Sequence, residues 1–107
     1  MFTVQNVIDQ SNKMSSDPNL LTLAIDFKSE IQKEVADSFA DNPASKFMSI
    51  NNIVIREGKL RLAKIQKTET NIFCIALAVG TILKELHEDT SYVSNQAIAN
   101  YMNQLVS

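Results

Sequence analysis

Apolar side chains recur at helical spacing in the segment that begins at Asp17-Pro18. Asp17 suits the N-cap because a residue before proline avoids the helical region, and Pro18 suits the first helical position. The stripe advances by three or four residues at a time, through Leu20, Ala24, Phe27, Ile31, Val35 and Phe39, and is widened by Leu21 and Ile25. Pro43 disfavours helix at Asn42, so the pattern predicts a long amphipathic helix over 18–41.

The period of the pattern changes to two in the segment 53–65. With a two-residue turn at Glu57-Gly58, four large aliphatic side chains share one face, namely Ile53, Ile55, Leu60 and Leu62. A slip by one residue sends aliphatic side chains to the wrong face, so this register is preferred. The pattern predicts a β-hairpin, which must pack on helices because two strands alone are not stable.

Three further segments have helical signals. Residues 3–15 and 94–105 carry amphipathic stripes, and residues 72–83 are apolar nearly all round, which predicts a central buried helix. Gly80 within that helix can permit the close approach of a neighbour. The order is helix, long helix, β-hairpin, helix and helix, so we expect an α+β fold in one compact domain over 1–107.

The segment Ser94–Met102, with its Ile98-Ala99 pair, resembles the first helix of a helix-turn-helix. Only five residues follow it, too few for a recognition helix. We therefore interpret the pair as helix packing and do not expect a DNA reader of this class.

Composition places the chain among ordinary globular proteins. Lys and Arg number 10 against 12 Asp and Glu, a net charge of −2, which disfavours a generally basic nucleic-acid binder. The single cysteine cannot form an intramolecular disulfide, which fits a reducing compartment. The first ten residues lack the features of a signal peptide, and the apolar run 72–83 is too short to span a bilayer. We expect a cytoplasmic protein, or one of the host cell cytoplasm if it is viral, with no membrane partner.

Charge is distributed unevenly along the chain. The net charge is −4 over residues 1–41, +5 over 42–67 and −3 over 68–107. The basic residues of the middle segment are candidates for binding a partner protein or an anion: Lys46, Arg56, Lys59, Arg61, Lys64 and Lys67. The competing interpretation is a solvated hairpin face whose lysines discourage edge pairing.

No residue pattern indicates catalysis. Cys74 and His87 are 13 residues apart on one predicted helix, about 20 Å at 1.5 Å per residue, too far to act as a nucleophile–base pair. The chain cannot supply the usual Cys and His ligands of zinc, and no Gly-rich phosphate loop is present. We therefore expect no catalytic residues, no metal and no cofactor.

The predicted helix over 18–41 is long for a chain of this size. Twenty-four residues reach about 36 Å, close to the diameter expected of the whole domain. Part of its stripe is therefore expected to meet another subunit in a homodimer or higher homo-oligomer. The candidate interface residues are Leu20, Phe27, Ile31, Val35 and Phe39.

Two classes of function remain. The first is a non-enzymatic protein–protein interaction protein that acts as a homo-oligomer, such as a small adaptor, chaperone or inhibitor of the kind that phages and plasmids encode. The alternative is an anion- or nucleic-acid-binding module that uses the basic hairpin over 53–67.

Overall fold

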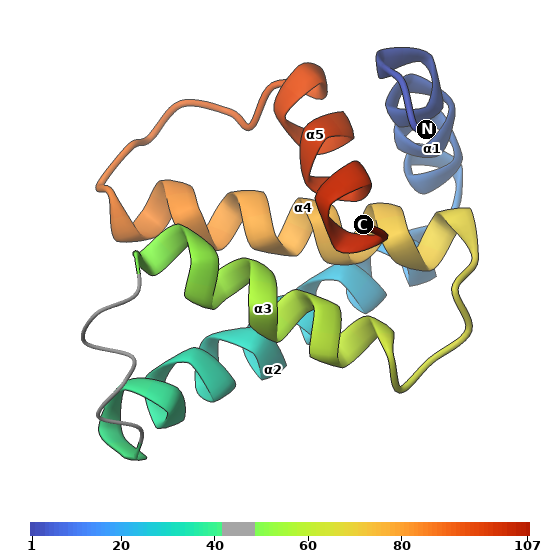
Figure 1. Cartoon of the computed structure of the whole chain (residues 1–107). Helices are drawn as coiled ribbons and strands as arrows, with labels where there is room; N and C mark the ends of the chain where they lie inside the picture. The colour runs from blue at the N-terminus through green and yellow to red at the C-terminus, as the bar shows by residue number, and fades with distance from the viewer. Residues whose placement is uncertain (42–48) are drawn as a thin grey trace.

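Five helices make up the structure, a computed structural model that describes residues 1–41 and 49–107 (Figure 1). They are α1 (Val4–Ser16), α2 (Pro18–Asp41), α3 (Ile50–Leu62), α4 (Glu69–Leu86) and α5 (Asn95–Leu105). The Cα atoms have a radius of gyration of 13.4 Å. This is the value expected of one compact domain of this length.

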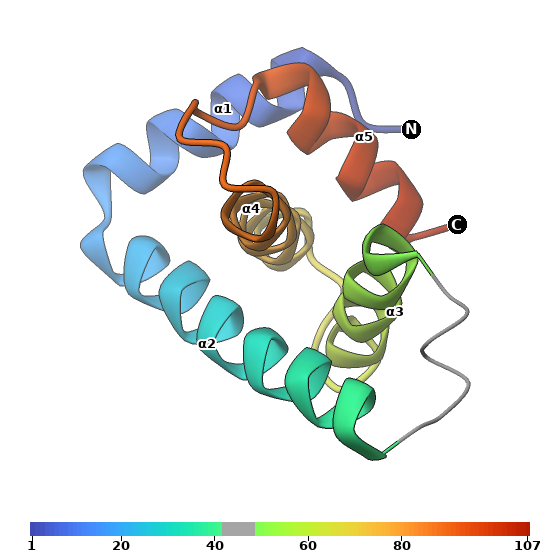
Figure 2. The same cartoon turned by 90° about the vertical axis from the view of Figure 1, so that its left-hand side faces the viewer.

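Helix α4 lies at the centre, with the other four helices arranged around it (Figure 2). Most of its side chains between Ile72 and Leu83 are buried, on all sides of the helix. The prediction of a central buried helix is confirmed. Within the described ranges, no helix has both the length and the apolar character needed to cross a membrane.

Helix α2 begins and ends where the sequence predicts. Pro18 is its first residue and Asp17 precedes it, with Oδ1 of Asp17 accepting a hydrogen bond from the backbone N–H of Asn19 at 3.0 Å. This bond satisfies one of the amides that a helix leaves unpaired at its N-terminus. Phe27 and Ile31, on the inner face of α2, are 4% and 1% exposed.

The two flanking helices also match their predicted ranges within about one residue. Helix α5 is capped by Ser94, whose hydroxyl oxygen accepts from the N–H of Ala97 at 3.1 Å. Ile98 and Ala99 are buried in the core, as expected of a packing role. Helix α1 packs against α5 and α2.

The predicted hairpin is wrong, and with it the α+β fold class. Residues 50–62 form helix α3, and the described part of the chain contains no strand. Ile53 and Leu62 are buried, as the hairpin also required, but Leu60 of the same predicted face is 51% exposed. The fold is all-helical.

Local signals explain why this segment is a helix. Ser49 is its N-cap, and its hydroxyl oxygen accepts from the N–H of Asn52 at 3.3 Å. Apart from the glycine, residues 56–64 are all strong helix formers, Arg, Glu, Lys, Leu or Ala. The buried positions Val54, Gly58 and Leu62 are spaced four residues apart, which is one face of a helix.

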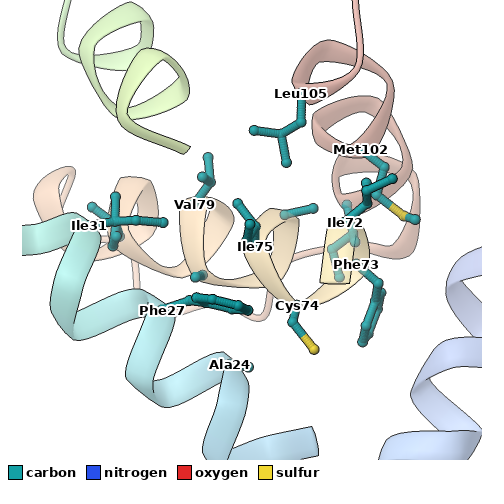
Figure 3. Packing of buried hydrophobic residues seen from close by; sticks show 14 of the residues in the cluster. Ala24, Phe27, Ile31, Ile72, Phe73, Cys74, Ile75, Val79, Met102 and Leu105 are labelled. Atoms are coloured by element: carbon teal, nitrogen blue, oxygen red, sulfur yellow. The ribbon is translucent and has the colours of Figure 1, made fainter. Parts of the chain in front are cut away.

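Glycine allows close packing at two places on the core. A Cβ atom at Gly58 would lie 2.9 Å from Cδ2 of Leu105 and 3.0 Å from Cγ2 of Val79, two residues of the buried cluster (Figure 3). A Cβ atom at Gly80 would lie 2.8 Å from Cγ1 of Val93. The close approach predicted at Gly80 is confirmed, whereas Gly58 lies inside a helix and not in a turn.

Candidate functional site

The basic residues of the middle segment do not share one face. Arg61 forms an ion pair with Glu30 of α2, and its guanidinium carbon lies 5.9 Å from the centre of the Phe27 ring. Arg56 donates from Nη2 to Oγ of Ser38 at 2.6 Å. Both arginines therefore interact with the acidic helix α2 of the same chain.

The lysines of this segment lie in different surroundings. Lys59 donates from Nζ to the backbone carbonyl oxygen of Ser107 at 3.2 Å. Lys64 is exposed and borders a hollow of about 330 Å³ between α2 and α3, together with Glu30 and Glu34. Lys67 is exposed in the connection from α3 to α4, and Lys46 lies outside the described residues. The described basic residues therefore do not form the common face expected of a hairpin. Arg56 and Lys59 border one hollow, Arg61 and Lys64 border another, and Lys67 lies in the connection after α3.

Arg61→Ala is expected to lower the free energy of unfolding by about 1 kcal/mol. The change removes a partly buried ion pair and a cation–π contact, each of which contributes a fraction of a kcal/mol to about 1 kcal/mol. Lys59→Ala is the matched control on the exposed side of the same helix, with an expected change within about 0.5 kcal/mol. Urea unfolding followed by circular dichroism measures both, and equal effects would contradict this assignment.

The stripe expected to meet another subunit is largely covered within one chain. Phe27, Ile31 and Val35 are between 1% and 6% exposed, in the core that α2 forms with α3 and α4. Leu20 is half-buried, and Phe39, near the end of α2, is 41% exposed. The sequence shows that α2 has an apolar stripe but not which helices cover it, and α4 and α3 cover most of it.

A second apolar flank of α2 remains exposed. Leu21 and Ile25, which only widen the stripe in the sequence, are 50% and 54% exposed. They border a hollow of about 260 Å³, the α4 groove, which is lined by Leu21, Ala24, Ile25, Lys28, Leu77, Ala78 and Thr81. The groove places two exposed apolar side chains beside a floor that contains small residues.

The α4 groove exists because α1 covers only the beginning of α4. Asn6 donates to Oε1 of Glu69 at 2.8 Å, and Gln10 donates to Oε2 of the same carboxylate at 3.2 Å. Glu69 is the first residue of α4, whereas Leu77 and Thr81 lie two and three turns further on and are partly exposed. No other helix of the described part covers this side completely, since the hollow is open there.

One charged side chain, Lys28, lines the α4 groove and is paired with a residue of α4. Nζ of Lys28 lies 2.6 Å from Oε1 of Glu85, and Gln32 donates to Oε2 of the same carboxylate at 3.1 Å. These contacts connect α2 to the C-terminal half of α4. The apolar residues of the groove thus adjoin a polar group at this end, and apolar centres with polar edges are usual in protein-binding surfaces.

Cys74 and His87, the two candidate residues for nucleophilic chemistry, differ in exposure. Cys74 is fully buried, with Sγ 3.8 Å from the backbone oxygen of Leu20, and desolvation raises the pKa of its thiol from 9.0 to about 11. His87 is exposed at the other end of α4, with Nε2 3.4 Å from Oδ1 of Asn51. Within the described residues, no group of three or more His, Cys, Asp or Glu side chains could hold a metal ion.

Burial of Cys74 gives a stability difference that depends on pH. Because the folded pKa of about 11 lies above the ordinary value of 9.0, the unfolded chain ionises first and stability falls as pH rises from 9 toward 11. Cys74→Ala lacks this effect and is expected to be about 1 kcal/mol less stable at pH 7. The stability gap between the two proteins should close as pH rises above 9 and reverse by pH 10.5 in urea unfolding, because ionisation of the unfolded thiol then costs the wild-type chain about 2 kcal/mol. A gap of constant size would contradict a buried neutral thiol.

Comparisons of the chain with protein-family models, with curated proteins and with solved structures found no match.

Proposed function

We propose that this chain is a non-enzymatic protein-binding protein, of the adaptor, chaperone or inhibitor kind, whose docking surface is the α4 groove. Its partner presents the apolar face of a helix. The buried unpaired cysteine supports a reducing compartment such as the cytoplasm, and the net charge of −2 supports a protein over a nucleic acid as partner.

The exposure of Leu21 and Ile25 is the observation that carries the proposal. Their side chains lie one turn apart on α2 and are half exposed, although α2 has a complete buried face elsewhere. Exposed apolar side chains that adjoin one another mark interaction sites more often than isolated ones do.

The shape of the groove supports a helix as the ligand. The floor contains Ala24 and Ala78, whose small side chains let another backbone come close. Helices that bind grooves insert apolar side chains at intervals of three and four residues. Leu77 and Thr81, four residues apart on α4, run along the groove in the same repeat.

Site-specific photo-crosslinking tests the docking surface. A benzoylphenylalanine is introduced at position 21 or 25 in the natural source cells, with position 59 on α3 as the matched exposed control. We expect covalent adducts with a protein from positions 21 and 25 only. The purified chain that carries both Leu21→Gln and Ile25→Gln is expected to lose binding to that crosslinked protein. Absence of adducts, or equal yields at all three positions, would overturn the proposal.

A further inference from the structure

We propose that the helix bound in the α4 groove is α2 of a second copy of this chain, packed antiparallel around a two-fold axis between Leu21 and Ile25. This inference rests on the proposed function and names the partner for the same surface. It follows from the order of side chains along the exposed flank of α2.

The exposed flank of α2 has opposite charges at its two ends. Leu21, Ile25 and Lys28 are spaced four and three residues apart, so they follow one line along α2, and Asp17 lies directly before the first residue of the helix, at the N-terminal end of this line. The line reads negative, apolar, apolar, positive. When two copies of this line run antiparallel, the negative end of each lies opposite the positive end of the other.

In an antiparallel pair of α2 helices, each of these four residues lies opposite a favourable partner residue. A two-fold axis between residues 21 and 25 places Leu21 against the partner's Ile25, and the reverse contact forms by symmetry. The same axis lies about 9 Å along the helix from Asp17 and about 7.5 Å from Lys28. Asp17 therefore meets the partner's Lys28, once on each side of the axis. A parallel pair would place like charges together.

The intramolecular contacts of Asp17 and Lys28 leave capacity for these ion pairs. Lys28 contacts Glu85 and keeps 27% of its side chain exposed, and an ammonium group has three donors. Asp17 accepts from the N–H of Asn19 through Oδ1, and a carboxylate has further acceptor sites. Exposed ion pairs contribute mainly to orientation and specificity, so Leu21 and Ile25 supply most of the attraction.

Charge reversal with mixing tests the antiparallel arrangement. Sedimentation velocity is measured over a concentration series up to about 1 mM, which covers the weak association expected of a small interface. Asp17→Lys and Lys28→Glu, each alone, are expected to weaken self-association at least about tenfold, because each places like charges opposite one another. An equimolar mixture of the two variants is expected to associate within about threefold of the wild-type chain, since every pair is again opposite.

The neutral variants separate an effect on folding from an effect on association. The crosslinking experiment separates binding to a second copy from binding to another protein. Asp17→Asn keeps an N-cap residue, and Lys28→Gln keeps a polar side chain that favours helix but removes its charge. Both variants should stay folded and weaken association less than the reversals. A wild-type chain that stays monomeric, with adducts to another protein at positions 21 and 25, overturns self-pairing but leaves the proposed function. A dimer unaffected by either reversal overturns the antiparallel arrangement.

Discussion

Gly58→Asn is expected to lower the free energy of unfolding by about 3 kcal/mol. The Cβ atom alone would lie 2.9 Å from Leu105 and 3.0 Å from Val79, and the amide beyond it would be buried among Ile75 and these two residues without a hydrogen-bond partner. Helix α3 would have to move away from α4 and α5. Urea unfolding followed by circular dichroism at 222 nm measures the loss.

Two controls separate this cause from a change of backbone preference. Lys59→Asn makes the neighbouring substitution on the exposed side of α3, and its expected cost is about 0.5 kcal/mol because it loses helix propensity and one exposed hydrogen bond to Ser107. Gly58→Ala combines a better helix former with a smaller overlap, so its expected change is within about 1 kcal/mol. An exposed hairpin turn would accept asparagine easily, so a stable Gly58→Asn variant would contradict the helical assignment.

Phe73→Ala is expected to be the most destabilising single truncation considered, at about 4 kcal/mol. Phe73 is 2% exposed and belongs to the buried cluster around α4 (Figure 3). Removing its ring loses the burial energy and leaves a cavity that the surrounding helices fill only in part.

Phe39→Ala is the matched control, because Phe39 is 41% exposed near the end of α2. Its expected cost is about 1 kcal/mol. Both values come from the same urea experiment. Equal costs for the two phenylalanines would show that α4 is not the centre of the core.

The long helix and the central helix could be predicted because local and global signals agree there. Asp17-Pro18 defines the start of α2, and Pro43 limits its extension. An apolar run without a polar face can only be buried, which places α4 at the centre. The remaining helices must then surround α4, because they are the other parts of the chain that can cover it.

The segment 50–62 could not be assigned from its alternation because several aliphatic residues satisfy both periods. Ile53 and Leu62 are buried in either structure. Gly58 is the decisive residue, since a glycine on a buried helical face has no side chain to mark that face, and Glu-Gly also resembles a turn. The Ser49 cap and the helix formers after Arg56 are the signals that favour the helix.

The candidate site could be predicted only as far as the helix that carries it. The sequence identifies α2 as an interaction helix, but it indicates the most apolar stripe of α2 as the interface. Phe27 and Ile31 of that stripe are buried against neighbouring helices of the same chain. The exposed flank of Leu21 and Ile25 looks like an extension of the same stripe. Which part stays uncovered depends on where α1 ends along α4, and no local pattern encodes that.

The central claim is that the flank of α2 beside the α4 groove is the surface that binds protein, and that the bound protein is a second copy of this chain. Amide ¹H–¹⁵N spectra of the wild-type chain at about 20 μM and about 1 mM test it most directly, since weak association shifts the amides at the interface. We expect concentration-dependent shifts that centre on Leu21, Ile25 and Lys28 and extend to Leu77 and Thr81. Identical spectra at both concentrations, or shifts that centre on the exposed side of α3, would contradict it.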